Sequence, residues 1–342
     1  MRHIALLPLL LATLTLGCEA RLNSALNGEF NLEDAGADAP VDAPDAAQDA
    51  LEDTRAQDTS DDAQTDTVED QTLPVDMSDA AADVPDMPPP PAYLSAGCGG
   101  TQGLTEGEQT FQLDGLERRY VVRLPENYDQ SRPWPLVLAL HGNGGSPSYW
   151  DATSGARNIR EVLKRDAVLI IPAAIDKQWK DYSLSDQEVR VRLEQELVYF
   201  DHIIERAKND LCINTDALFS MGFSGGGSYS GVLSCRRTDI RAIAVGGSVV
   251  YFNEDNCVGK SAAWIAISEG DFSSGRERYL NFFRDRVNCQ PDSDPVAPED
   301  CVSYKSCDAD HPVHYCAHPG GHKWPDFGAQ AMWDFFSTFV AP

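Results

Sequence analysis

A serine lies among glycines in the run GFSGG, residues 222–226. This run fits the pattern G-x-S-x-G, a sharp turn from a strand into a helix that presents a nucleophilic serine at the edge of a sheet. Residues 217–221 are predicted as the strand and residues 228–235 as the helix. A phosphate-binding loop would need a lysine after the glycines, and GFSGGGSYS has none. The sequence therefore predicts that Ser224 is the nucleophile of a hydrolase.

A serine hydrolase also needs backbone N–H groups for the oxyanion of its tetrahedral intermediate. The first is expected from Gly225, directly after the nucleophile. The second is expected from HGNGG, which follows an apolar run and places Asn143 or Gly144 at the required turn. We interpret His141 as a structural member of this turn rather than as a base.

A second group of reactive side chains lies in CDADHPVHYCAHPGGHKWPD, residues 307–326, which contains four of the seven histidines: His311, His314, His318 and His322. The spacing of its Cys and His residues is typical of a zinc site. Alternation along a strand would, however, send His311 and His314 to opposite faces. Because a triad base is expected after a late strand, we predict His322 as the general base, and no metal or other cofactor.

Charge and composition divide the chain into parts. Residues 1–18 have the features of a secretory signal, and Gly17-Cys18 resembles a lipobox, so Cys18 is the expected lipidation site on an exported, surface-anchored protein. Residues 19–91 hold 20 of the 54 acidic residues and two of the 27 basic ones, so we predict a disordered acidic linker over 19–92. The remaining domain, 93–342, is moderately acidic and has no basic stripe, which argues against nucleic-acid binding.

The cysteines support export. Without Cys18, eight of the nine cysteines remain, an even number that favours up to four disulfides in an oxidising compartment. Their pairing is open at this stage: Cys307 and Cys316 are expected to bond with each other or with Cys289 or Cys301.

Periodicity predicts the fold class. An antiparallel hairpin is expected around Asp114-Gly115, and the continuous apolar runs 135–142 and 167–174 are typical of strands buried on both faces. A helical pattern covers 189–207, and further short strands alternate with helices up to an apolar helical face over 332–339. The expected domain is α/β, with a mainly parallel sheet, an N-terminal antiparallel hairpin and helices on both faces.

The ordered pieces GCGG, RRYVVRLPENYD, PLVLALHGNGG, GFSGGG and GGHKWP resemble the secreted polyhydroxybutyrate depolymerase and feruloyl or acetylxylan esterase family. The resemblance spans about residues 97–340 and implies an α/β-hydrolase fold with Ser224 as nucleophile and His322 as base. The family's H-G-x-x-D string falls on ISEGD, which implies Asp271 as the acid. Ile267 and Ser268 depart from that string, so Glu269 is kept as the alternative acid.

The resemblance implies an extracellular serine esterase acting on a polymer-linked ester. No separate polymer-binding module is visible, which favours feruloyl or acetyl esters on plant polysaccharide over the alternative, a polyester depolymerase. Trp179 and Tyr182, in IDKQWKDYS, are candidate stacking residues for the substrate. The domain is expected to be monomeric. Two other hypotheses are a non-catalytic binding protein on a hydrolase scaffold and a zinc hydrolase that uses the histidine cluster.

Overall fold

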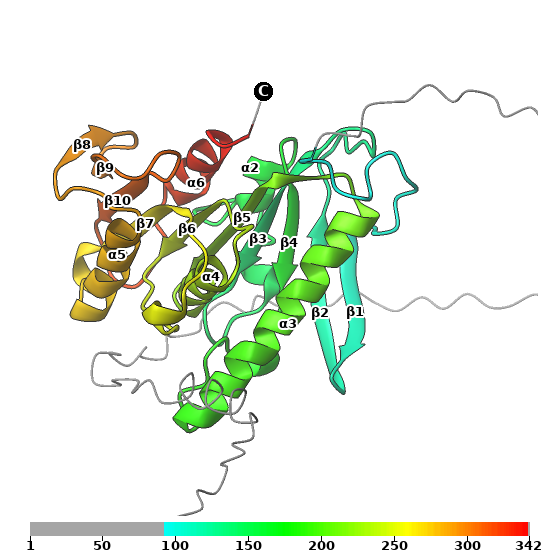
Figure 1. The fold of residues 1–342 in the computed structure, drawn as a ribbon, viewed down its shortest axis with the longest axis horizontal. Coiled ribbons are helices and arrows are strands. Elements are labelled where there is room, and N and C mark those ends of the chain that lie inside the picture. The colour runs from blue at the N-terminus through cyan, green and yellow to red at the C-terminus, as the bar shows by residue number, and fades with distance from the viewer. Residues whose placement is uncertain (1–91, 341–342) are drawn as a thin grey trace, which may run out of the picture. The chain divides into compact units, whose positions relative to one another are not determined.

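A ten-stranded sheet organises residues 92–340, the part of the chain that the computed structural model describes (Figure 1). Its order is β1-β2-β4-β3-β5-β6-β7-β10-β9-β8. The six strands from β4 to β10 in this order are parallel, and antiparallel strands flank them at both edges. The strands are β1 (Gly107–Leu113), β2 (Leu116–Arg123), β3 (Trp134–Leu140), β4 (Val168–Pro172), β5 (Ile213–Phe223), β6 (Ala242–Gly246), β7 (Ala262–Ser268), β8 (Ser293–Val296), β9 (Cys301–Tyr304) and β10 (Val313–His318).

The predictions for the signal sequence, for Cys18 and for the acidic linker lie outside the described residues. No helix within residues 92–340 is long and apolar enough to cross a membrane.

The edge hairpin and the central strands follow from local sequence. Asp114 and Gly115, with φ angles of 51° and 78°, join β1 to β2 in the left-handed conformation that an Asp-Gly turn favours. Every residue of β3 and of β4 is buried, as expected of parallel strands covered on both faces. The predicted hairpin and both predicted buried strands are therefore confirmed.

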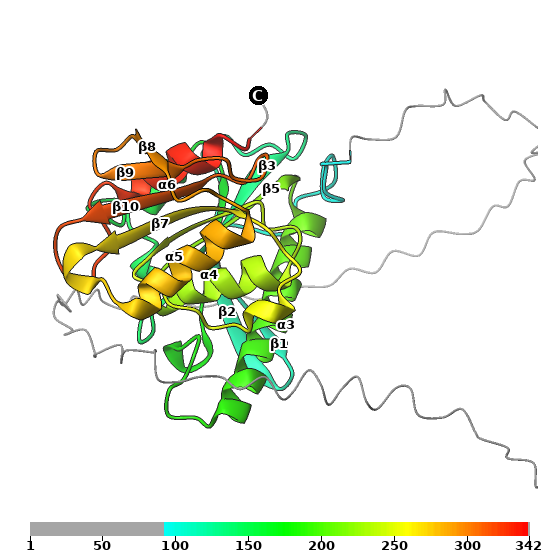
Figure 2. The same cartoon turned by 60° about the vertical axis from the view of Figure 1, so that its left-hand side comes forward.

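Helices cover both faces of the sheet (Figure 2). The helices α3 (Asp186–Asp210), α4 (Gly225–Arg236) and α5 (Ser274–Arg286) pack in one hydrophobic cluster, whereas α2 (Ile159–Leu163) and α6 (Gly328–Ser337) pack in the other. The long helix α3 begins at a capping box in which the Ser185 and Glu188 side chains bond each other's backbone N–H groups. This two-faced packing confirms the predicted α/β class.

The antiparallel strands at the C-terminal edge were not expected from the sequence. Strand β8 contains Pro295, which lacks a backbone donor and is tolerated because β8 is an edge strand. Its polar sequence SDPV offers no apolar alternation to detect. The helix α5 was also missed, since its sequence SGRERYLNFFRDR is mostly polar.

Four disulfides join the eight cysteines of the described domain: Cys98–Cys212, Cys235–Cys257, Cys289–Cys307 and Cys301–Cys316. The prediction of a four-disulfide set is confirmed. Cys307 and Cys316 bond not with each other but with Cys289 and Cys301: Cys301–Cys316 joins β9 to β10, and Cys289–Cys307 joins the segments that flank the β8–β9 hairpin. A set of this size is typical of proteins that fold in an oxidising environment outside the cytosol.

A buried ion pair organises the loop after β4. Arg118 lies 2.6 Å from Glu196 of α3, and both side chains are almost fully buried. Arg118 also donates to the Ala173 carbonyl, and the other Glu196 oxygen accepts from the Ile175 amide at 2.9 Å. Burial raises the pKa of Glu196, and the Arg118 charge opposes that shift. Removing one partner of such a pair typically costs about 3–5 kcal/mol, so this contact holds the 173–175 segment firmly in place.

Candidate active site

The candidate nucleophile lies at the turn between β5 and α4. Ser224 has φ 55° and ψ −126°, a strained conformation for a residue other than glycine. Its amide donates to the Gly246 carbonyl at 2.8 Å, which ties the turn to the end of β6. Strand β5 is longer than the strand predicted over 217–221, and α4 is longer than the helix predicted over 228–235. Only Ser224 separates the two elements. The strand, turn and helix of the G-x-S-x-G pattern are all present.

The two outer glycines of the turn are required by close backbone contacts. A Cβ on Gly222 would lie 2.5 Å from the Gly226 backbone. A Cβ on Gly226 would lie 2.2 Å from the Leu140 carbonyl oxygen and 2.4 Å from that of His141. Both distances are far below van der Waals contact, so the spacing of glycines around the serine reflects the absence of room for side chains.

Two of the three amides considered for the oxyanion have no partner among residues 92–340. Gly225 is the first residue of α4, where an N–H has no intrahelical acceptor. The Asn143 amide likewise has no acceptor in the described structure. The Gly144 amide donates to the Lys177 carbonyl at 2.8 Å and is therefore already used, so the prediction for Gly144 is wrong. Asn143 and Gly225 remain as the candidate pair.

The Asn143 side chain is held in place from the loop after β4. Its Oδ1 accepts from the Trp179 amide at 3.0 Å, and its Nδ2 donates to the Lys180 carbonyl at 3.1 Å. A Cβ on Gly225 would lie only 2.4 Å from that Oδ1. The side chain of Asn143 therefore packs directly on the first turn of α4, beside Gly225.

The structure brings together the predicted base and the predicted acid. His322 Nδ1 lies 2.6 Å from Asp271 Oδ2. Two hydrogen bonds join their loops: Ser268 Oγ donates to the Gly321 carbonyl at 2.6 Å, and the Gly270 amide donates to the Gly320 carbonyl at 3.0 Å.

The alternative acid does not take part in this contact. Glu269 is exposed, and no hydrogen bond or ion pair within residues 92–340 joins it to His322. Within this loop, Asp271 rather than Glu269 faces the histidine.

The imidazole of His322 lies against the serine turn. Its ring packs on Phe223 at a centroid distance of 4.7 Å, and a Cβ on Gly247 would lie 2.8 Å from its Cε1. His322 Nε2 is buried and forms no hydrogen bond within the described residues. The Ser224 hydroxyl also makes no hydrogen bond there, an arrangement common in unliganded hydrolases, where catalytic contacts shorten on substrate binding.

His141 has the environment of a structural residue. It is fully buried, with Nδ1 2.8 Å from the Gly142 carbonyl, and Nε2 accepts from the Ala174 amide at 3.3 Å. Burial lowers the pKa of His141 to about 4, so the ring is neutral near pH 7. With both nitrogens engaged, His141 links the turn after β3 to the segment after β4.

The remaining histidines do not form a metal centre with the neighbouring cysteines, because Cys307 and Cys316 are both in disulfides. Within residues 92–340 no group of three or more His, Cys, Asp or Glu side chains is arranged to hold a metal ion. His311 precedes β10 rather than lying on it, and burial lowers the pKa of His314 and of His318.

The prediction that Trp179 stacks on substrate is wrong. Its side chain is fully buried between His141, Phe200 and Tyr229, and its Nε1 donates to the His141 carbonyl at 2.6 Å. The indole therefore packs against the turn after β3 that contains His141. Tyr182 is 42% exposed and stays a candidate for substrate contact.

Two residues near the site were missed. Tyr251 follows β6, is fully buried, and lies with its hydroxyl 2.8 Å from that of Tyr182 and 3.4 Å from Asn143 Nδ2. Its position after the carboxyl end of a central strand was an available signal. Arg276 of α5 contacts both Asp271 and His322. Nothing in its sequence neighbourhood separates it from the other arginines of that helix.

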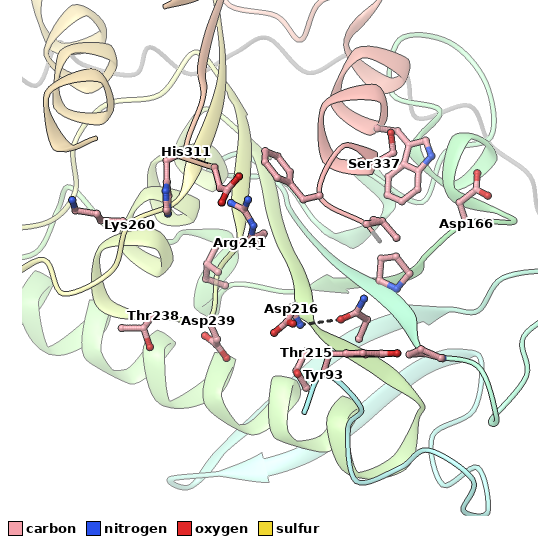
Figure 3. Close-up of a pocket in the computed structure, with 18 of the residues that line it drawn as sticks. Tyr93, Asp166, Thr215, Asp216, Thr238, Asp239, Arg241, Lys260, His311 and Ser337 are labelled. Atoms are coloured by element: carbon pink, nitrogen blue, oxygen red, sulfur yellow. Dashed lines mark hydrogen bonds between the residues drawn. The ribbon is translucent and has the colours of Figure 1, made fainter. Parts of the chain in front are cut away.

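A cavity of about 1070 Å³ lies at the amino ends of the central strands, away from the carboxyl ends that carry the candidate site (Figure 3). Its lining includes Asn214 and Asp216 at the start of β5 and Arg241 just before β6. Ser224, Asp271 and His322 do not line it. In α/β sheets of this kind, ligands bind at the carboxyl ends of the parallel strands. This cavity is therefore not the catalytic site.

The sheet and the positions of the three side chains define a class of protein. Ser224 follows β5, Asp271 follows β7 and His322 follows β10, which is the chain order Ser, Asp, His expected of the α/β-hydrolase fold. Among solved structures, one described as native pOPH aligns with a TM-score of 0.51 at 14% identity, over 72% of this chain and 89% of that one. The chain has the α/β-hydrolase fold.

Sequence comparison narrows the class. Feruloyl esterase D of Neurospora crassa is 29% identical over 279 residues, 72% of this chain and 91% of the relative. Feruloyl esterase C of Emericella nidulans is 28% identical over 266 residues, 71% of this chain and 90% of the relative. No protein-family model matches the chain. The chain thus has the α/β-hydrolase fold and is similar in sequence to proteins named feruloyl esterases.

The contact between Gly225 and Asn143 predicts the effect of adding one methyl group. In Gly225→Ala the new Cβ would displace the Asn143 side chain, so we expect kcat to fall about tenfold to a hundredfold while the protein still folds. Steady-state kinetics on an aryl ester and thermal unfolding measure the two quantities. Gly321→Ala is the control, because no atom lies within 4 Å of its Cβ position. Wild-type kcat in Gly225→Ala would contradict the assignment of these amides.

Proposed function

We propose that this protein is an extracellular serine esterase in which Ser224, His322 and Asp271 form the catalytic triad. The observation that carries the proposal is the 2.6 Å contact between His322 and Asp271 beside a strained serine turn. Surface-binding proteins have no need of a serine held in this conformation, whereas a nucleophile requires it. The four disulfides and the fungal esterase relatives support an extracellular location.

The proposed reaction gives each of these groups a role. Asp271 accepts from His322 Nδ1–H, which leaves Nε2 unprotonated and able to take the Ser224 proton. The serine oxygen then bonds to the ester carbonyl carbon, and the amides of Asn143 and Gly225 donate to the resulting oxyanion. His322 returns the proton to the departing alcohol, and the ester C–O bond breaks. Water, deprotonated by His322, then releases the acid from Ser224.

The substrate class rests on the sequence relatives and on the shape of the site. Both relatives described above are named feruloyl esterases. Only 47 positions separate Ser224 from Asp271, and β6 and β7 occupy part of that stretch, which leaves little chain for a lid. Tyr182 is an exposed aromatic side chain whose hydroxyl contacts that of Tyr251, and Tyr251 in turn contacts Asn143. We therefore propose feruloyl esters on plant polysaccharide, with acetyl esters and polyesters as the alternatives.

The triad assignment predicts graded losses of activity. Ser224→Ala should lower kcat by about 10⁴-fold or more, and Asp271→Asn by about 10⁴-fold because the histidine tautomer is lost. Glu269→Gln should stay within about threefold of wild type, since Glu269 does not contact His322. The measurement is turnover of an aryl ester, with a fluorophosphonate probe that labels wild type but not Ser224→Ala. Comparable losses in Glu269→Gln and Asp271→Asn would contradict Asp271 as the acid.

The choice of ester predicts a ranking of substrates. Parallel assays on methyl ferulate, acetylated xylan and polyhydroxybutyrate film should give the highest kcat/KM for methyl ferulate. Tyr182→Ala should raise KM for methyl ferulate and leave that for a small acetyl ester unchanged, since only the aromatic acid offers a ring for stacking. Activity on the polyester film alone would replace the feruloyl assignment with the depolymerase alternative.

The anchor proposed for the N-terminus rests on sequence alone. We infer that Cys18, in its lipobox-like context, carries lipid and that the acidic segment 19–92 separates the enzyme from the membrane surface. Labelled palmitate should enter the wild-type protein and not Cys18→Ser in the native host. Equal labelling of both proteins would exclude this site.

A further inference from the structure

Arg276 occupies a position that ordinary helix electrostatics disfavours. It lies in the first turn of α5, where backbone N–H groups make the helix end partially positive and acidic side chains are preferred. It is also only 9% exposed, and a buried cation is costly unless another charge compensates it. Both features favour a compensating anion nearby, and Asp271 of the candidate triad supplies one.

The guanidinium group contacts the acid, the base and the start of its own helix. Arg276 Nε lies 2.9 Å from Asp271 Oδ2, as an ion pair whose N–H does not point along the hydrogen-bond direction. Arg276 Nη2 lies 3.1 Å from His322 Nδ1, and Nη1 donates to Ser273 Oγ at 3.1 Å. The same carboxylate oxygen, Oδ2, is 2.6 Å from His322 Nδ1. One oxygen atom therefore serves both the base and the arginine.

The proton arrangement in this cluster follows from the donors and acceptors. A guanidinium has only donors and a carboxylate only acceptors, so the 2.6 Å contact between Asp271 and His322 requires a proton on Nδ1. Arg276 then cannot donate to Nδ1 and acts through its charge on Asp271. The Arg276 charge, 2.9 Å from Oδ2, attracts the carboxylate and resists its rotation away from the histidine.

We propose that Arg276 is a positioning residue that holds Asp271, and through it His322, in the geometry that directs Nε2 to Ser224. This inference rests on the proposed function and adds a supporting residue to the three residues of the proposed triad. Arg276 acts through Asp271 and touches neither the nucleophile nor the oxyanion amides. Its effect is therefore expected on kcat rather than on KM, because a displaced base slows proton transfer without weakening ground-state binding.

The same helix supplies a matched control. Arg278, two residues along α5, pairs with Glu254 at 3.0 Å but is 51% exposed, and it lies outside the cluster. Exposed ion pairs contribute at most about 1 kcal/mol to stability, and this one does not contact Asp271 or His322. Arg278→Met removes an arginine and an ion pair from α5 in the same way as Arg276→Met, so the comparison isolates the contact with Asp271.

The first experiment is kinetic. We expect Arg276→Met to lower kcat about tenfold to a hundredfold with KM within threefold of wild type, and Arg278→Met to leave both unchanged. Guanidinium chloride at non-denaturing concentration should restore part of the kcat of Arg276→Met, whereas urea, which has a similar planar shape and no charge, should not. A kcat within threefold of wild type, or equal rescue by urea, overturns the proposal.

A second variant covers the case in which Arg276→Met does not fold. Arg276→Lys keeps a cation in the buried site, but its compact ammonium cannot contact both Asp271 and Ser273 Oγ as the guanidinium does. We expect its kcat to fall at least threefold with an unchanged melting temperature, and an unchanged kcat overturns the proposal.

A spectroscopic measurement separates this inference from the proposed function. The His322 Nδ1–H proton should give a far-downfield NMR resonance that is lost in Asp271→Asn and shifted or broadened in Arg276→Lys. Arg278→Met should leave the resonance unchanged. If wild type cleaves no ester, the proposed function fails, yet the resonance still tests the contact. An identical resonance in wild type and Arg276→Lys overturns the positioning role even if the esterase activity is established.

Discussion

The close approach of the β5–α4 turn to the end of β3 is the constraint on which the rest of the site depends. Gly226 lies so near the carbonyl oxygens of Leu140 and His141 that no side chain fits between them. This contact sets the direction in which α4 leaves the sheet, and thus the strained backbone of Ser224. The Asn143 side chain packs against the neighbouring Gly225, so the proposed nucleophile and the proposed oxyanion donors are positioned by adjacent packing contacts.

The other parts of the site are loops that are held to this turn by polar contacts. The acid and base loops are joined to each other by hydrogen bonds from Ser268 and Gly270. The segment after β4 is held by the buried pair of Arg118 and Glu196 and in turn orients Asn143. Such loops are surface elements with little apolar area of their own, so buried polar bonds replace hydrophobic packing in keeping them rigid.

Much of this could be predicted because local sequence specifies it. The Asp-Gly hairpin, the buried parallel strands and the serine turn each depend on residues that are neighbours in the chain. Trp179 was predicted to face the substrate but is buried. Its exposure depends on contacts with Phe200 and Tyr229, which lie on helices distant in the sequence. Strand β8 was missed because an edge strand next to solvent needs no apolar alternation.

The sequence by itself determined the fold class, the candidate serine turn and the late position of the candidate histidine, since these follow from periodicity, glycine spacing and chain order, whereas Asp271 was implied by the family resemblance. It left open the choice between Asp271 and Glu269, between Asn143 and Gly144, and among disulfide pairings. Tertiary structure decided which carboxylate faces His322, which amide is already bonded and which cysteines meet. It alone revealed Arg276 beside Asp271, because a contact between a helix and a separate loop leaves no periodic trace in the chain.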